Sequence, residues 1–287
     1  MKHRVPRGMG TLSDAEVVAL LKAELGRELQ RCDRRRKQVF LDLFGGTAGV
    51  TAAIRKLGYG CICFELTRGQ QYDLTCRAVL KLVKGWISSG VVIGASVATP
   101  CSTFSRARRG KPAVPDSGRI VRSRRHPWGI LSLSPKERIA VDLGNATARA
   151  SIQIIKKLTH HGLPVILENP INSQLFYVLQ NLLRRKDCTC ISTDQCQFGA
   201  RWRKRTRLCC WNIHDPASLA RLCTGKRGLC SRSLQHHIVL TGSSPSGVPW
   251  SRLAQTYTPP FARAIANALA LSADEQYLSN VRSLLQR

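Results

Sequence analysis

A cysteine that directly follows a buried-strand pattern is the residue of this sequence best placed for covalent chemistry. Residues 90–97 (GVVIGASV) form a short apolar run rich in β-branched side chains, typical of a buried parallel strand. Pro100 ends the strand because it has no backbone N–H to donate, and Cys101 comes next. Ligands of open α/β sheets bind beside the carboxyl ends of the strands, so this position favours a nucleophile. A small apolar core cysteine is the alternative.

A carboxylate occupies the same kind of position after another strand pattern. Residues 165–168 are apolar up to Glu168, and Asn169-Pro170 then ends the strand. Cys101 and Glu168 are both expected at carboxyl ends of parallel strands, where they can face one crevice. A thiolate beside a carboxylic acid suits covalent attack on an electron-poor ring, because the acid can donate to a ring nitrogen while sulfur adds to carbon. A surface carboxylate is the alternative for Glu168.

A basic segment follows Cys101. Arg106, Arg108 and Arg109 are neighbours that would favour the thiolate form of this cysteine. They open a loop, residues 106–133, and loops of this length are usually functional or disordered. We expect the loop to lie against phosphates, contacts that position a nucleic acid and do not specify its sequence. The residues assigned to nucleic-acid contact are Ser105, Arg106, Arg108, Arg109, Arg124 and Arg125.

A glycine-rich turn follows the first strand pattern, residues 39–43. Asp42-Leu43-Phe44-Gly45-Gly46 lets a ligand approach the backbone closely, and the next helix offers free N–H groups, although no G-x-G-x-x-G fingerprint is present. Glu65, at the end of the second strand pattern, is placed to accept hydrogen bonds from ribose hydroxyls, and Asp73 is a candidate for contact with an adenine ring. Their order favours a nucleoside-type cofactor. The alternatives are an ordinary tight turn for Gly45 and Gly46, a solvated charge for Glu65 and a helix N-cap for Asp73.

The charge of the chain is strongly unbalanced. The 287 residues include 45 Lys and Arg against 17 Asp and Glu, a formal net charge of +28. This excess repels itself unless an anionic partner neutralises it, which favours nucleic acid. No run of 18 apolar residues and no signal-peptide core is present, so we expect no membrane association. We expect an intracellular protein, nuclear in a eukaryote and otherwise cytoplasmic, with most of its 12 cysteines reduced.

Strand and helix patterns alternate as in an α/β fold with a doubly wound, mostly parallel sheet. Capping boxes at Ser13 and Ser134 mark two helix starts. The expected strands are residues 39–43, 61–65, 90–97 and 165–168, with weaker candidates at 189–195 and 206–212. The expected helices are residues 14–31, 50–57, 74–88, 134–161, 173–185 and 259–271.

Taken in order, these motifs resemble those of the cytosine-5 DNA methyltransferase family. Residues 42–46 are similar to the family's first motif, DLFSGxGG. Pro100-Cys101-Ser102-Thr103-Phe104-Ser105 matches PCxxFS at every fixed position, and Glu168-Asn169-Pro170 is similar to the ENV motif. The resemblance covers about residues 39–210, with a weaker echo at 257–266. It implies a Rossmann-like fold that binds S-adenosylmethionine. A shift of composition to Cys, His, Gly and Ser over residues 215–250 separately predicts a small irregular lobe.

The resemblance also implies roles for individual residues. Cys101 would attack carbon 6 of a cytosine, Glu168 would engage ring nitrogen 3, and carbon 5 would take the methyl group. A target base inside duplex DNA would have to be flipped out of the stack. Glu65 would bind the ribose of S-adenosylmethionine and Asp73 its adenine. The full set assigned to the cofactor is Asp42, Phe44, Gly45, Gly46, Glu65, Asp73 and Pro100.

The sequence departs from the family pattern at Gly45, which replaces Ser, at Pro170, which replaces Val, and in three larger respects. The arginine motif QxRxR has no clean match; residues 195–199 are followed by alternating arginines, of which we expect Arg203 and Arg205 to contact the base. Generic phosphate binding is the alternative for both. The interval from Glu65 to the nucleophile strand is short, so a third strand of the family sheet would be vestigial. The region before the last helix is too short for a large recognition domain, so specificity would be low or supplied by a partner protein.

Cysteines and histidines are concentrated late in the chain. Cys223-x6-Cys230-x5-His236 could supply three ligands to a structural zinc ion, and Cys188, Cys190, Cys196, Cys209, Cys210 and His237 lie in the same part of the sequence. The spacing is loose and no paired CxxC motif exists, so reduced, partly buried cysteines are the alternative. We assign no metal ligands from the sequence.

The sequence therefore predicts four parts: a basic lead and helix (1–35), an S-adenosylmethionine-dependent catalytic domain (36–214), a small Cys/His-rich lobe with a possible role in target recognition (215–256), and a C-terminal helix that packs back on the catalytic domain, with a tail (257–287). The expected activity is DNA cytosine-5 methylation by a monomer. An RNA methyltransferase of the same fold is the near alternative. A catalytically silent nucleic-acid-binding module of a mobile-element or viral protein is another, against which intact Cys101 and Glu168 argue.

Overall fold

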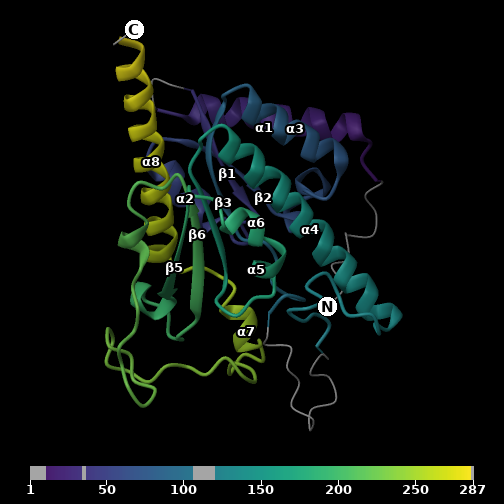
Figure 1. The fold of residues 1–287 in the computed structure, drawn as a ribbon, viewed down its shortest axis with the longest axis vertical. Coiled ribbons are helices and arrows are strands. Elements are labelled where there is room, and N and C mark those ends of the chain that lie inside the picture. The colour runs from purple at the N-terminus through teal and green to yellow at the C-terminus, as the bar shows by residue number, and fades with distance from the viewer. Residues whose placement is uncertain (1–10, 34–36, 106–119, 286–287) are drawn as a thin grey trace.

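A computed structural model describes residues 11–33, 37–105 and 120–285, and its centre is one six-stranded sheet with strand order β2-β1-β3-β4-β6-β5 (Figure 1). Strands β1 to β4 are mutually parallel. β6 runs antiparallel to both β4 and β5. The α/β class is confirmed, and the sheet is mixed. The strands are β1 (Val39–Leu43), β2 (Gly60–Phe64), β3 (Val92–Val97), β4 (Val165–Pro170), β5 (Cys188–Asp194) and β6 (Arg205–Trp211).

Helices cover both faces of the sheet. One apolar cluster joins the sheet to α1 (Asp14–Arg31), α3 (Arg77–Ser88) and α4 (Pro135–His160). A second cluster on the opposite face contains α2 (Gly49–Lys56) and α8 (Pro259–Leu285), the long helix at the side of the sheet in Figure 1. Because β1 to β3 are buried on both faces, their sequences are almost continuously apolar.

Local signals fix most of the boundaries. Both predicted capping boxes form: Ser13 with Glu16 at the start of α1, and Ser134 with Glu137 at the start of α4. The single helix expected over residues 173–185 is instead two short ones, α5 (Leu175–Val178) and α6 (Gln180–Leu183). α8 joins the amphipathic helix expected over residues 259–271 and the tail, which was also expected to be helical and polar, in one continuous helix. β2 is an edge strand, and no further strand pairs with it in the described part of the chain.

The strand directions gather the functional segments at one edge of the sheet. Since β5 and β4 both run antiparallel to β6, the carboxyl ends of β1 to β5 and the amino end of β6 lie at the same edge, called the carboxyl edge below. Chain order reverses at β1, which lies between β2 and β3. Such a switch point opens a crevice at the carboxyl ends of the flanking strands, where α/β folds bind ligands.

A segment with little regular structure follows the sheet. Residues 220–249, all described, contain no helix or strand and only two isolated bridges, Leu229 with His236 and Ser243 with Pro249. We call this segment the lobe; in Figure 1 it forms the looping green trace at the end of the molecule near α7 (Trp250–Leu253). No helix among the described residues is both long enough and apolar enough to cross a membrane.

Close packing forces a glycine at the end of β1. A Cβ on Gly45 would lie 2.7 Å from Asp42 Oδ2 and 2.7 Å from Cys63 Sγ, both held in the sheet. Gly85, within α3, has no atom within 4 Å of its added Cβ.

We predict that Gly45→Ala lowers the free energy of unfolding by about 1–3 kcal/mol, because the side chains around it cannot relax without breaking buried contacts. Gly85→Ala is the matched control and should raise it by about 0.5–1 kcal/mol, as expected for an exposed helix position. Urea unfolding followed by circular dichroism measures both. Equal stability of the two variants would contradict the crowding at Gly45.

Candidate active site at the carboxyl edge

The turn that carries Cys101 is anchored to two other elements. Thr99 Oγ1 lies 2.7 Å from Ser151 Oγ of α4, and Asn169 Nδ2 donates to the Thr99 carbonyl at 2.7 Å. Asn169 directly follows Glu168, so its amide fixes the end of β4 against the segment that precedes Cys101. Cys101 itself is partly exposed at the carboxyl edge. The Glu-Asn-Pro motif therefore has a structural role in addition to the carboxylate that it presents.

A buried arginine holds the second half of the turn. Arg122 is 3% exposed, donates to Thr103 Oγ1 and to Asn145 Oδ1, and lies over the Phe104 ring at 3.8 Å. Gly144 of α4 makes room for it, since a Cβ there would lie 2.8 Å from Arg122 Nη2. This arginine of the basic loop is thus a structural support for the PCxxFS turn.

Glu168 is a buried carboxylate surrounded by donors from distant parts of the chain. Thr206 Oγ1 donates to Oε1 at 3.1 Å, and the Tyr257 hydroxyl donates to Oε2 at 2.9 Å. Lys204 Nζ lies 3.5 Å from Oε1 and supplies a positive charge. The carboxylate is 7% exposed, so these partners compensate for its loss of water. They also fix its orientation at the carboxyl edge.

Cys101 belongs to the same electrostatic cluster as Glu168. Burial raises the pKa of the Cys101 thiol, the charge of Lys204 lowers it, and the charge of Glu168 raises it. The net direction is upward, so the cysteine is a protonated thiol at neutral pH. Arg106, Arg108 and Arg109, which were expected to favour the thiolate, lie outside the described residues, so their influence stays a prediction. Burial and Glu168 also raise the pKa of Tyr257, whose hydroxyl stays a donor.

Arg203 and Arg205 both pair with one buried carboxylate. Arg203 Nε and Arg205 Nε donate to the two oxygens of buried Asp194 at 3.2 and 2.9 Å. Adjacent side chains of an extended segment point in opposite directions, so Lys204 between them contacts Glu168. The charges of Arg203 and Arg205 are thus paired with Asp194, and Lys204 and Thr206 reach the Glu168 carboxylate. Base contact through Arg203 and Arg205 stays a prediction.

The glycine-rich turn lies at the switch point of the sheet. Phe44 and Gly46 have φ values of 58° and 53°, and a Cβ on Gly46 would meet nothing within 4 Å, so the backbone is open to a ligand. Gly46 N donates to Glu65 Oε2 at 3.1 Å, which places this partly exposed carboxylate beside the turn. Gly45 is the crowded position described above. Phe44, Gly46 and Glu65 thus share one surface.

The other residues assigned to the cofactor differ in exposure. Asp42 is 2% exposed; its carboxylate accepts from Ser96 Oγ at 2.6 Å and from Thr51 N at 3.0 Å. Burial raises the pKa of Asp42. This residue supports the turn from inside the sheet, which corrects its assignment as a ligand contact. Asp73 is partly exposed and accepts from Thr75 N at 2.8 Å, before α3 begins, and Pro100 is exposed beside Cys101.

The described residues assigned to nucleic-acid contact lie around the Cys101 turn. Ser105 is partly exposed and ends the turn. Arg124 and Arg125 are exposed, and the Arg124 guanidinium carbon lies 5.7 Å from the centre of the Tyr177 ring. These side chains are accessible to a polyanion.

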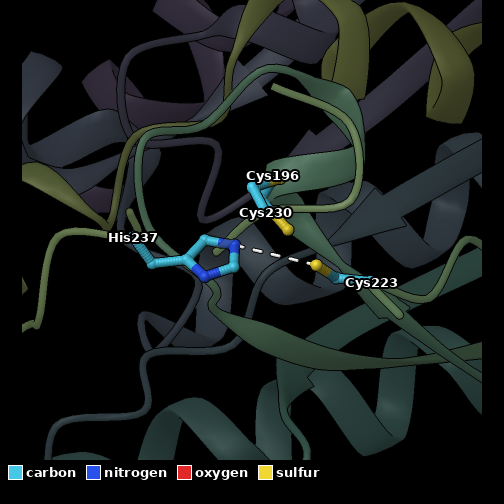
Figure 2. Close-up of side chains that lie close together, drawn as sticks. All are labelled: Cys196, Cys223, Cys230 and His237. Carbon is cyan, nitrogen blue, oxygen red and sulfur yellow. Dashed lines mark hydrogen bonds between the residues drawn. The ribbon is translucent and has the colours of Figure 1, made fainter. Parts of the chain in front are cut away.

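A second constellation joins the lobe to the carboxyl edge. One ligand atom from each of Cys196, Cys223, Cys230 and His237 lies within 4.8 Å of the others, and Figure 2 shows the sulfur atoms and the imidazole converging. Burial opposes ionisation of Cys223, but hydrogen bonds from Ser231 and neighbours outweigh it and lower its pKa to about 6. The set is compatible with structural zinc. The sequence pointed to His236, which is exposed; His237 is the residue in the cluster.

With the site described, the chain can be compared with known proteins. Searches of family models, of curated proteins and of solved structures gave no significant match. The function must therefore be argued from the chemistry of the site itself.

Sequence reasoning missed three residues of the site, Lys204, Thr206 and Tyr257. The strand predicted at residues 206–212 could have indicated two of them. Lys204 and Thr206 are two residues apart, and such residues lie on the same face of an extended strand. Tyr257 opens the weaker echo of the family pattern at 257–266 but was given no role, and its contact with Glu168 spans 89 positions of the chain.

The charges around Cys101 predict how its reactivity depends on pH. Glu168→Gln removes a charge that raises the pKa of the thiol, so alkylation of Cys101 by iodoacetamide should begin at lower pH than in the wild type. Lys204→Gln removes a charge that lowers this pKa, so alkylation should begin at higher pH. Peptide mass spectrometry of Cys101 across a pH series measures both shifts.

The matched control is Lys84→Gln, on α3, where the lysine bonds to Gln153. It should leave the Cys101 profile unchanged. Shifts in the same direction for Glu168→Gln and Lys204→Gln would show that the two charges do not act on this sulfur as described.

Proposed function

We propose that this protein is an S-adenosylmethionine-dependent DNA cytosine-5 methyltransferase. The observation that carries the proposal is the shared electrostatic cluster of the Cys101 thiol and the Glu168 carboxylate, at the edge of the sheet that also bears the Gly45-Gly46 turn. Covalent attack on a pyrimidine needs a sulfur and a proton donor in one place. The resemblance to the PCxxFS and DLFSGxGG motifs names the same residues.

The residues at the switch point fit the proposed cofactor. The open backbone at Gly46 admits close approach of a ligand. The partly exposed Glu65 carboxylate, held by Gly46 N and by Thr67, would accept from the ribose with its remaining lone pairs. Phe44 and Asp73 are also partly exposed, and they precede and follow Glu65 in the order that the family motifs imply. S-adenosylmethionine would supply an electrophilic methyl group at this place.

Cys101 would act on the base in its thiolate form. Its proton leaves first, to solvent at this partly exposed sulfur, and the neighbouring Lys204 charge stabilises the thiolate. Sulfur then bonds to carbon 6 of cytosine, and the electron pair of the carbon 5–carbon 6 double bond moves to carbon 5, which becomes nucleophilic enough to be methylated. A water molecule then takes the proton from carbon 5; its electron pair re-forms the carbon 5–carbon 6 double bond and the carbon–sulfur bond breaks, so that the thiolate is regenerated.

Glu168 would hold the base during this addition. Its carboxyl group, once protonated, donates to ring nitrogen 3 and withdraws electrons from carbon 6. Thr206 and Tyr257 orient the group through their hydroxyl donors, and Lys204 lies on the same oxygen as Thr206. We assign to Lys204 and Thr206 the place beside the base that the sequence had suggested for Arg203 and Arg205.

The proposed partner is DNA. A net charge of +28 favours a polyanion, and the exposed Arg124 and Arg125 lie on the segment that follows the Cys101 turn. A cytosine in a duplex would have to leave the stack to reach a sulfur at the end of β3. Phosphate contacts of this kind would hold the strand while the base is turned out.

Transfer of labelled methyl groups tests the proposal. The full-length protein is incubated with labelled S-adenosylmethionine and with DNA or RNA of matched sequence. We predict label on DNA, recovered as 5-methylcytosine, and a loss of roughly 10³-fold or more in Cys101→Ser. Cys76→Ser, a partly exposed cysteine at the start of α3, is the control and should retain activity.

Other outcomes decide between the alternatives. Label on RNA alone would replace the DNA assignment with an RNA methyltransferase. No label on either polymer, from protein that still binds them, would overturn the enzyme and favour a binding module. Equal activity of wild type and Cys101→Ser would remove Cys101 from the mechanism.

A further inference from the structure

The lobe has almost no apolar interior of its own. Among residues 220–249 only Cys223, Cys230 and Ser244 are buried, whereas Leu234 and Val239 are 79% and 69% exposed. Cys223 and Cys230 form their own small cluster with Cys196, separate from the two clusters of the sheet. A segment that buries so little apolar surface needs another source of stability, which small domains commonly obtain from disulfides or metal ions.

The geometry of the cysteines and histidine suits a metal ion better than a disulfide. Cys223 Sγ lies 3.8 Å from His237 Nε2 (Figure 2). Ligand atoms of a tetrahedral zinc ion lie about 3.3–3.8 Å apart, from bond lengths of about 2.0–2.3 Å. Three thiols and one imidazole make a complete tetrahedral set, and all of the chain's described cysteines are free.

The sulfur atoms are already surrounded by donors. Ser231 donates to Cys223 Sγ from its backbone N at 3.4 Å and from its Oγ at 3.5 Å. Gln197 Nε2 lies 3.7 Å from Cys196 Sγ and 3.9 Å from Cys230 Sγ. Donors of this kind stabilise thiolate ligands and orient them, as outer-shell partners do in metal sites.

We propose that Cys196, Cys223, Cys230 and His237 bind one structural Zn²⁺ ion, which fastens the lobe to the carboxyl edge of the sheet. Cys196 comes from the turn Gln195–Phe198 that directly follows β5, and the other three ligands come from the lobe. With all four positions filled by protein atoms, the ion is structural and has no open site for a substrate. The proposal does not depend on the methyltransferase activity.

The site is also linked to the neighbouring arginines. Cys223 N donates to Asp194 Oδ2 at 2.9 Å, and Arg203 Nη2 donates to the Cys223 carbonyl at 2.8 Å. Asp194 in turn binds Arg205 at the start of β6. The zinc ion would therefore stabilise the segment from which Lys204 reaches Glu168.

Metal content and cobalt spectroscopy test the site without reference to activity. We predict one zinc ion per chain by elemental mass spectrometry of the purified full-length protein. We also predict thiolate charge-transfer and tetrahedral d–d bands after cobalt substitution. Cys223→Ser and His237→Asn should lose the metal or change the cobalt spectrum. His236→Asn, the adjacent exposed histidine, is the matched control and should keep both.

Proteolysis of the wild type keeps the proposal testable if a variant fails to fold. Lys226 and Arg227 of the lobe are exposed. Removal of zinc by a chelator should speed tryptic cleavage after them, because the lobe loses its fixed conformation, and added zinc should slow the cleavage again. Absence of bound metal in the wild type, or an unchanged cobalt spectrum in both Cys223→Ser and His237→Asn, would overturn the site. An unchanged tryptic pattern after complete zinc removal would overturn its structural role.

Discussion

The buried carboxylate of Glu168 is the constraint on which the arrangement of the site depends. A carboxylate that has lost its water is costly unless donors replace it, and breaking such a set by removing one partner is strongly destabilising. The donors come from the start of β6, from the residue before it, and from the segment that leads into α8. One side chain thus ties together β4, the antiparallel strand and the C-terminal helix. The position of Tyr257 explains why a helix so late in the chain belongs to the site.

The segment 203–206 separates two charge systems. Arg203 and Arg205 pair with Asp194 on the side of the lobe, and Lys204 and Thr206 contact Glu168 on the side of Cys101. Alternation along an extended chain produces this separation from a nearly uniform run of basic residues. In the free protein the Cys101 thiol is protonated, because burial and Glu168 outweigh Lys204. The proposed nucleophile would therefore have to lose this proton before its sulfur attacks a bound cytosine.

Features that depend on neighbouring residues could be predicted from the sequence, and features that depend on long-range packing could not. Capping boxes, glycine turns and apolar strands are local, so α1, α4, β1 and the edge position of Cys101 could be predicted from the sequence. The strand pattern and the resemblance to known motifs both pointed to Glu168. Neither indicated that Lys204 contacts its carboxylate, since the residues of β6 that face Glu168 depend on where the pairing of β6 with β4 begins. The reversed direction of β6 and the choice of His237 over His236 depend on long-range packing that no short pattern encodes. In the lobe the bridge of Leu229 with His236 accompanies the turning of His237 towards the cysteines.

Covalent trapping tests the meeting of Cys101 and Glu168 at the carboxyl edge most directly. In a DNA oligonucleotide that contains 5-fluorocytosine, fluorine cannot leave as a cation, so the sulfur adduct persists after carbon 5 is methylated. In the presence of S-adenosylmethionine we predict a protein–DNA species that survives denaturing electrophoresis. Peptide mapping should place its bond at Cys101, and Glu168→Gln should form it far more slowly. No adduct from protein that binds this DNA and S-adenosylmethionine, or an adduct at a different cysteine, would contradict the proposed site.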